Sequence, residues 1–458
     1  MRIDLDIPLK LKEIWKEVDA CSPPQNSENY ISAICTDSRE CKENDLFIAL
    51  EGENGSSENF VPDALKKGCT VISKSREKCV ISVKDTTDAL LRIAKLYKSK
   101  TQIAHTVAVT GSVGKSTTVK FIKKLLYSKF EVHSPMGNYN NHIGVPLTVL
   151  SAPASTKVLV AELGMNHKGE ISVLSDCVVP DVGIITSIGT SHIGNLGSRQ
   201  EIACAKLEIL DGMKGGYLLV PYDEPLLNGA KNSFTVGRNT SLSSFALNDR
   251  SNGTYEFISQ YGSISGISFF DKRPHILTDL TFAISVSQIL GLTADEIKTA
   301  VSSIRESDLR QRFIPLERFT IFDDSYNASL ESIKADLEFI SKHPSPRGAF
   351  LGDVLELGEM ASSIHEEVGK LAAYYKMDHL YLYGQYAPHT ARGAIKNGMD
   401  ENCVYINNNI RAPEISVRQI EDNCSFGELI LFKASHRLRL DKIADMIVSE
   451  ERNKNERI

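Results

Sequence analysis

Short apolar runs alternate with segments of helical periodicity along most of the chain. Residues 103–109 form one such run, and Val119, Ile122, Leu125 and Leu126 then recur at the spacing of one helix face. This alternation is typical of a mostly parallel β-sheet covered by helices. We therefore predict an α/β protein, with further strands at residues 158–162, 181–188, 217–220, 320–324, 348–352, 379–383 and 429–433.

The chain has 458 residues, which is too long for one ordinary hydrophobic core. At about 150 residues per domain, this length predicts three domains. Residues 238–266, rich in Ser, Asn and Gly, predict antiparallel strands before a helix at 277–290. The charged residues 450–458 lack apolar periodicity and predict a frayed end. The predicted domains span residues 1–100, 101–311 and 312–458.

The composition argues against several classes of partner. A formal net charge of -6 and a pI near 6.0 do not favour a general surface for nucleic acid or anionic membranes. No run approaches about 18 consecutive apolar residues, and the first residues lack the apolar core of a signal peptide. The nine cysteines include no C-x-x-C pair, as expected for free thiols in a reducing compartment. We expect a cytoplasmic protein with no nucleic-acid partner and no stable membrane insertion.

One motif, T-G-S-V-G-K-S-T-T at residues 110–118, predicts a phosphate-binding loop between a strand and a helix. Its spacing, G-x-x-G-K-S, is more compact than the general pattern, because Val109 stands where that pattern has its first glycine. A plain Gly/Ser turn with an exposed lysine is the alternative, and the flanking strand and helix argue against it. The residues that this motif assigns to a nucleoside triphosphate, which the family resemblance given below identifies as ATP, are Thr110, Gly111, Ser112, Val113, Gly114, Lys115, Ser116 and Thr117.

Polar side chains follow several other apolar runs, at the strand ends where ligand sites gather in open parallel sheets. Glu162 ends the run at 158–162, where P-loop proteins commonly hold magnesium with an acidic group. His192 and Lys206 follow in the same predicted domain. Each of the three residues alone is more often solvated or structural. The functional interpretation therefore depends on their occurring together.

The order of these motifs resembles that of the Mur ligase family, the ATP-dependent amide ligases of peptidoglycan precursor synthesis. The compact phosphate loop is similar to the family's own loop, and the similarity covers nearly the whole chain. The other matching segments are T-D-S-R at 36–39, D-L-F-I-A-L-E-G at 45–52, N-Y-N-N-H-I-G-V-P-L at 138–147, A-E-L-G-M-N-H-K-G-E-I at 161–171, D-D-S-Y-N-A-S at 323–329 and L-G-D-V-L-E-L-G at 351–358.

The resemblance implies a domain plan and a reaction. Residues 1–100 would bind the UDP part of the substrate, 101–311 would be the central ATP-binding domain, and 312–458 would be a Rossmann-like ligase domain. The implied reaction joins D-alanyl-D-alanine to UDP-MurNAc-tripeptide through an acyl phosphate made with ATP. The implied cofactors are ATP and Mg2+ at two sites. The implied partners are these small-molecule substrates, bound by a monomer.

The resemblance also implies roles for single residues. Lys115, His192 and Lys206 would be catalytic. Ser116 and Glu162 would hold the first magnesium, while His192 and a carbamate formed on Lys206 would hold the second. The further ATP contacts implied are Asp279, Arg312, Asp323 and Asp324. The substrate contacts implied are Ser38, Arg39, Asn138, Asn140, Asn141, Asn166, His167, Tyr326, Asn327, Asp353 and Glu356.

Some of these assignments have alternatives. Asp353 and Glu356 could orient the incoming amine, or they could cap a helix start beside Gly352. Residues 273–279 read R-P-H-I-L-T-D where the family has G-x-H-N-x-x-N, so the carboxylate of Asp279 replaces an amide donor. Departures of this kind leave open a related ligase that joins a different acid and amine.

Two further classes are disfavoured. A P-loop switch or motor ATPase would not need the His192 and Lys206 pair, and the chain has no N-K-x-D guanine-reading motif. A catalytically inactive binding protein is disfavoured because Lys115, Glu162, His192 and Lys206 are all present.

Overall fold

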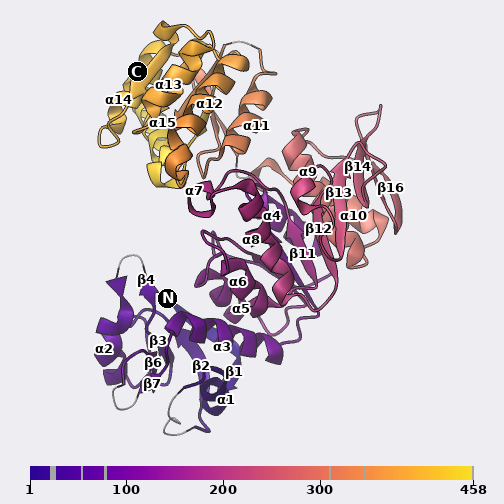
Figure 1. The fold of residues 1–458 in the computed structure, drawn as a ribbon, viewed down its shortest axis with the longest axis vertical. Helices are drawn as coiled ribbons and strands as arrows, with labels where there is room; N and C mark the ends of the chain where they lie inside the picture. Colours follow the sequence, from indigo (N-terminus) through magenta and orange to yellow (C-terminus); the bar gives the residue numbers. More distant parts are fainter. Residues whose placement is uncertain (21–26, 53–54, 77–79, 309–310, 345, 456–458) are drawn as a thin grey trace.

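The structure, a computed structural model, describes residues 1–20, 27–52, 55–76, 80–308, 311–344 and 346–455. Within these residues the strands form a five-stranded, a nine-stranded and a six-stranded sheet and one two-stranded ribbon. Figure 1 shows the three sheets in chain order along the long axis, from the N-terminal part at the bottom to the C-terminal part at the top. Helices alternate with the strands, which confirms the predicted α/β class.

The N-terminal sheet has the strand order β1-β2-β3-β6-β7 and reaches the central part through helix α3, which packs on α5 and α6. Asp85 caps α3, because its carboxylate accepts hydrogen bonds from the backbone N–H groups of Thr87 and Asp88 at 2.7 and 3.0 Å. The elements are β1 (Arg2–Lys10), α1 (Leu11–Glu17), β2 (Tyr30–Cys35), β3 (Leu46–Ile48), β4 (Glu51–Gly52), β5 (Gly55–Ser56), η1 (Ser57–Phe60), α2 (Val61–Lys66), β6 (Thr70–Ser73), β7 (Val80–Ser82) and α3 (Thr86–Lys100).

The central sheet has the strand order β16-β15-β14-β13-β12-β11-β8-β10-β9. The parallel register sets Glu162 of β10 opposite Val109 of β8, and Ile185 of β11 opposite Thr110. The carboxyl ends of β8, β10 and β11 therefore meet at one edge. The strands are β8 (His105–Thr110), β9 (Val132–His133), β10 (Val158–Glu162), β11 (Val182–Ile185), β12 (Tyr217–Pro221), β13 (Ser233–Arg238), β14 (Phe245–Asp249), β15 (Tyr255–Ser259) and β16 (Gly262–Ile267).

Helices cover both faces of this sheet. Val107 and Val109 of β8 share a core with α4 and α9, whereas Ala108 between them belongs to the core that contains α5 and α6. Strands buried on both faces are apolar along their whole length, which explains the continuous apolar runs in the sequence. The helices are α4 (Lys115–Leu126), α5 (Gly144–Leu150), α6 (Glu170–Val178), α7 (Ile193–Leu196), α8 (Arg199–Leu207), η2 (Glu208–Gly212), η3 (Pro225–Leu227), α9 (Pro274–Ile289), α10 (Ala294–Ser302) and η4 (Glu306–Asp308).

The C-terminal sheet has the strand order β17-β18-β22-β19-β20-β21, and only β17 in it is antiparallel to its neighbour. Its elements are β17 (Arg312–Pro315), β18 (Phe319–Asp323), α11 (Leu330–Ile340), β19 (Arg347–Gly352), η5 (Gly358–Met360), α12 (Ala361–Tyr374), β20 (His379–Tyr383), α13 (Ala387–Lys396), η6 (Glu401–Cys403), β21 (Val404–Asn407), α14 (Pro413–Asn423), β22 (Glu428–Lys433), η7 (His436–Leu438) and α15 (Leu440–Asn455).

Local predictions in these two parts have mixed outcomes. The antiparallel strands expected within residues 238–266 are present as β14, β15 and β16. The helix expected at 277–290 begins earlier, because Pro274 occupies the first helical turn, where a missing N–H costs nothing. The prediction of a frayed end at 450–458 was wrong for residues 450–455, because α15 continues to Asn455, and residues 456–458 lie outside the described part of the chain. The last buried apolar residue of α15 is Ile447.

Helix α9 places Asp279 directly beneath the phosphate loop. Gly114 has a positive φ of 91°, and a Cβ at this position would overlap the carboxylate of Asp279. Burial raises the pKa of Asp279 well above its usual range, which favours the neutral acid. A neutral carboxyl group donates one hydrogen bond, so the loss of the family's amide donor applies only to the ionised form.

The substitution Asp279→Asn is expected to change the pH dependence of stability. An unfolded aspartate loses its proton near pH 4, whereas the folded Asp279 retains it to higher pH, so the wild type loses stability as the pH rises through this window. The asparagine side chain in the variant does not titrate. Urea unfolding of the ligand-free protein should therefore show D279N more stable than wild type at pH 8, by a margin that shrinks toward pH 4.

The control for this experiment is Asp295→Asn, which changes an exposed carboxylate on α10. We expect its curve to follow the wild type at every pH. A D279N curve parallel to the wild type would show that Asp279 is ionised beneath the loop.

Candidate active site

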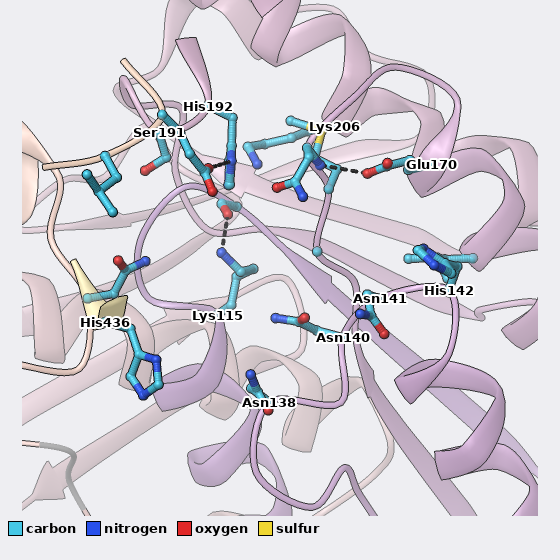
Figure 2. Close-up of a pocket in the computed structure, with 18 of the residues that line it drawn as sticks. Lys115, Asn138, Asn140, Asn141, His142, Glu170, Ser191, His192, Lys206 and His436 are labelled. Carbon is cyan, nitrogen blue, oxygen red and sulfur yellow. Dashed lines mark hydrogen bonds and ion pairs between the residues drawn. The ribbon is translucent and has the colours of Figure 1, made fainter. Parts of the chain in front are cut away.

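A cavity of about 1180 Å³ lies beside the carboxyl ends of the central strands. All three parts of the chain line it, and Figure 2 shows Lys115, His192 and Lys206 around the same space. Helix α3 supplies Thr87, Asp88 and Leu91, and Asp85 immediately precedes it. The C-terminal part supplies residues 326–329, 354–357 and 435–437. The central part supplies Gly111, Lys115, Asn138, Asn140, Asn141, His142, Gly164, Met165, Asn166, Lys168, Gly169, Glu170, Val173, Leu174, Ser191, His192 and Lys206.

The predicted phosphate loop connects β8 to α4 and is hydrogen-bonded to the segment that follows β11. Thr186 donates its hydroxyl to the carbonyl of Val113 at 2.5 Å, and the backbone N–H of Ser112 donates to Ser187 at 3.0 Å. A Cβ at Gly111 would overlap the Thr186 hydroxyl, so the close approach requires glycine there. Lys115 opens α4 and donates to the carbonyl of Gly111 at 2.7 Å, at the wall of the cavity.

Ser116 and Glu162 meet behind this loop. The Ser116 hydroxyl donates to Glu162 Oε2 at 2.6 Å, and Asn140 donates its side-chain amide to Oε1 at 3.0 Å. Glu162 is buried, and neither it nor Ser116 lines the cavity, whereas Asn140 does. A hydroxyl oxygen beside a carboxylate is a ligand pair that suits Mg2+.

Lys206 reaches the cavity from α8 and is 1% exposed. Burial lowers its pKa well below the usual range, and the positive charge of Lys115 lowers it further. The neutral amine is therefore favoured. A neutral amine is the form that can react with carbon dioxide, so the environment suits the carbamate that the family resemblance implies.

His192 links the central part to the C-terminal part. Its Nδ1 contacts Glu356 Oε2, and this contact lowers the pKa of Glu356. The backbone N–H of Gly194 donates to the carbonyl of Glu356 at 3.0 Å, and Thr190 donates its hydroxyl to Glu331 at 3.2 Å. Histidines that bind metals commonly donate their other ring N–H to a carboxylate, so the Glu356 contact is compatible with a metal at Nε2.

Among the C-terminal candidates, Tyr326, Asn327 and Glu356 line the cavity and Asp353 does not. The carboxylate of Asp353 accepts the backbone N–H groups of Gln385 and Tyr386 at 2.9 and 3.0 Å, just before α13. Asp353 therefore holds the turn that precedes α13, which differs from the helix cap beside Gly352 considered as its alternative. Burial raises the pKa of Asp353.

The remaining ATP candidates lie outside the lining of the cavity. Arg312 donates to Asp323 at 2.6 Å and is largely exposed. Asp324 is partly buried and pairs with Lys433, which also pairs with Asp336 at 2.7 Å. Burial raises the pKa of Asp324 to about 6, although Lys433 acts in the opposite direction. Asp323 and Asp324 therefore have separate partners, despite their adjacency in sequence.

Some of the predicted substrate-binding residues line the cavity and others do not. Asn138, Asn141 and Asn166 line the cavity with Asn140, whereas His167 is exposed outside it. In the N-terminal part Ser38 is buried and Arg39 is exposed, paired with Asp37 at 2.6 Å, and neither lines the cavity.

Sequence reasoning missed part of the wall. His436 and Arg437 follow the carboxyl end of β22, so the strand-end rule that found Glu162 also applies to them. Asp85 and Asp88 begin α3, where acidic residues are common for capping alone, and their sequence carries no separate signal of a site.

Two global observations bear on cofactors and membranes. Within the described residues, no three His, Cys, Asp or Glu side chains cluster as a ready-made metal site. Metal sites at this cavity would need the Ser116 hydroxyl and a modified Lys206. No helix in the described part of the chain is both long and apolar enough to cross a membrane.

The chain matches two family profiles and a set of curated relatives. The profiles are the Mur ligase middle domain, over residues 109–279, and the Mur ligase, glutamate ligase domain, over residues 309–436. The UDP-N-acetylmuramoyl-tripeptide--D-alanyl-D-alanine ligase of Bacillus subtilis (strain 168) is 34% identical over 442 residues, covering 93% of this chain and 95% of the relative. The enzyme of the same name from Escherichia coli (strain K12) is 29% identical over 399 residues, covering 83% and 88%.

Solved structures share the fold. MurF from Acinetobacter baumannii superposes with a TM-score of 0.85 at 24% identity, covering 98% of this chain and 100% of that chain. MurF ligase from Thermotoga maritima, in complex with ADP, has a TM-score of 0.78 at 24% identity, covering 92% and 98%. Since the profiles match both the phosphate-loop part and the C-terminal part, and a relative above 30% identity spans nearly the whole chain, the protein belongs to the Mur ligase family.

Proposed function

We propose that this Mur ligase uses ATP to join D-alanyl-D-alanine to UDP-N-acetylmuramoyl-tripeptide, the reaction in the names of its curated relatives. The observation that carries the proposal is a cavity that Lys115, His192 and Lys206 line together with Glu356 and Arg437. One wall offers groups for phosphate and metal, and the other offers groups for an amine and a carboxylate. We also propose that the protein is a cytoplasmic monomer and that residues 1–100 bind the UDP part of the substrate.

The first half-reaction brings two anions together. The terminal carboxylate of the tripeptide attacks the γ-phosphorus of ATP, an oxygen–phosphorus bond forms, and the bond to the bridging oxygen of ADP breaks. Lys115 and the amide-rich start of α4 would stabilise the charge that develops on the phosphoryl oxygens. Asn138, Asn140 and Asn141 line the cavity beside Lys115, where they would orient the carboxylate.

The residues present fit the two magnesium ions that the family implies. Ser116 and Glu162, already 2.6 Å apart, would hold one ion through hard oxygen ligands. His192, with Glu356 on Nδ1, and a carbamate on Lys206 would hold the other. Bound magnesium would supply positive charge to neutralise the polyphosphate.

The second half-reaction needs a neutral, oriented amine. The dipeptide amine attacks the acyl carbon, the new C–N bond forms, and the bond to the phosphate oxygen breaks. Glu356 lines the cavity and would orient the amine through its carboxylate, while the departing phosphate would accept the proton that the amine loses. His436 and Arg437, on the same C-terminal wall, would bind the dipeptide carboxylate. The dipeptide carries one positive and one negative charge, and the C-terminal wall offers the acidic Glu356 and the basic Arg437 to match them.

The direct test of the proposal is turnover with the purified protein. We expect phosphate release that requires ATP, magnesium, UDP-MurNAc-tripeptide and D-alanyl-D-alanine together. Mass spectrometry should find one new amide product and ADP. Turnover only with another acid and amine would instead identify a ligase of different specificity.

The substitution Lys206→Ala is expected to lower kcat by about 100-fold or more, because it removes the proposed carbamate ligand. Added formate or acetate should restore part of the activity by supplying a carboxylate in its place. Lys98→Ala is the matched control, since burial lowers the pKa of Lys98 to about 8, yet its amine donates to Val178 at 2.5 Å, away from the cavity. Undiminished turnover in K206A would refute the carbamate.

The substitution Arg437→Ala is expected to raise the KM for the dipeptide by about 10-fold, the cost of one hydrogen bond to a charged group. The KM for ATP should change little. Arg439→Ala provides the control, because Arg439 pairs with Asp441 at 2.6 Å and does not line the cavity. Equal dipeptide KM values in the two variants would place the acceptor carboxylate elsewhere.

A further inference from the structure

Arg273 precedes α9 and lies where the central part meets the C-terminal part. We call its contact with Gln311, Phe322 and Phe339 the joint. The Arg273 side chain is only 5% exposed, and its Nε donates to both carboxylate oxygens of Asp271 at 3.0 Å. Its Nη2 donates to the same carboxylate, and its backbone N–H does so at 2.9 Å. The guanidinium charge is therefore paired within the central part, and its plane is held in one orientation.

The same guanidinium contacts the C-terminal part. It lies 5.1 Å from the ring centre of Phe339 on α11 and 5.7 Å from that of Phe322 on β18. Its Nη1 donates to the side-chain oxygen of Gln311, just before β17, at 2.5 Å. A planar cation suits aromatic faces better than an ammonium does, so this contact is specific to arginine.

Helix α9 connects Arg273 rigidly to the phosphate loop. Asp279, six residues further along the helix, lies beneath Gly114, at a rise of about 9 Å from Arg273. Helix α9 also packs on α4, which begins with Lys115. The position of Arg273 relative to the phosphates is thus set by one short helical span.

On the C-terminal side, polar contacts lead from Gln311 to the cavity wall. Gln311 donates to Asp336 at 3.5 Å, and Asp336 pairs with Lys433 at 2.7 Å. Lys433 ends β22, and His436 and Arg437 follow it into the cavity. A shift of the C-terminal part on Arg273 would therefore displace the wall on which the amine substrate is proposed to bind.

We propose that Arg273, held by Asp271, is a positioning residue that fixes the C-terminal wall of the cavity relative to the phosphate loop. It contacts neither the cavity nor the reacting groups. Its effect on catalysis rests on the proposed ligation, because the acyl phosphate forms on one side of the joint and the amine binds on the other. Misplacement of reacting groups by about 1 Å is enough to slow a reaction about 100-fold.

The test compares Arg273→Met with Arg273→Lys. We expect R273M to lower kcat by about 10- to 100-fold and to raise the KM for D-alanyl-D-alanine, with the KM for UDP-MurNAc-tripeptide unchanged. R273K keeps the charge toward Asp271 and should fall between R273M and wild type. Small-angle scattering of the ligand-free proteins should give a larger radius of gyration for R273M, because the C-terminal part is no longer held on α9.

The control is Arg238→Met, which removes an arginine that donates to Asp249 at 3.1 Å between β13 and β14, both within the central part. It should match wild type in kcat, in both KM values and in scattering. Should R273M fail to fold, Phe339→Leu removes the contact from the opposite side and should give the same pattern of kinetic and scattering changes.

Wild-type kinetics and scattering in R273M, or in F339L where R273M does not fold, would overturn the proposal. So would equal increases in both KM values without a change in scattering. An inactive wild-type protein would refute the proposed function instead. In that case the scattering comparison alone would still decide whether Arg273 holds the joint.

Discussion

The close approach of the phosphate loop to buried polar groups is the contact on which the cavity depends. Gly111 lies against the Thr186 hydroxyl and Gly114 against the Asp279 carboxylate, and a Cβ at either position would overlap its neighbour. Because the loop packs closely against Thr186 and Asp279, α4 begins at Lys115 beside the cavity. Ser116 then donates to Glu162 at 2.6 Å. A side chain at either glycine would force the loop or its neighbour to move.

Charge and burial then give similar side chains different roles. Lys115 and Lys206 both line the cavity, but burial and the charge of Lys115 together favour a neutral Lys206. Lys433 is equally buried, yet Asp324 and Asp336 outweigh the effect of burial and raise its pKa. One lysine is thus suited to modification and the other to a permanent ion pair. The difference lies in the sign of the neighbouring charges.

The contact between the central and C-terminal parts combines strain with polar interactions. His192 and Glu356, which contact each other across it, both have positive φ values, 64° and 63°. Such a conformation costs a non-glycine residue about 1 kcal/mol or more and persists only where the surroundings determine it. On the buried side of the joint, Arg273 rests on Phe322 and Phe339. Buried apolar residues of both parts, among them Ile193 and Leu357, also belong to one hydrophobic cluster, so the polar contacts add orientation to a shared apolar contact.

The sequence by itself determined the α/β alternation, the compact phosphate loop and the placement of Glu162 at a strand end, because each depends on local periodicity or on spacing within a short segment. Only the tertiary structure decided that Asp353 holds the turn before α13, that Asp324 pairs with Lys433, and that Asp85, His436 and Arg437 join one cavity. These outcomes depend on partners tens to hundreds of residues away. Burial and neighbouring charge, which decide whether Lys206 or Asp279 is ionised, exist only once such distant segments have packed together.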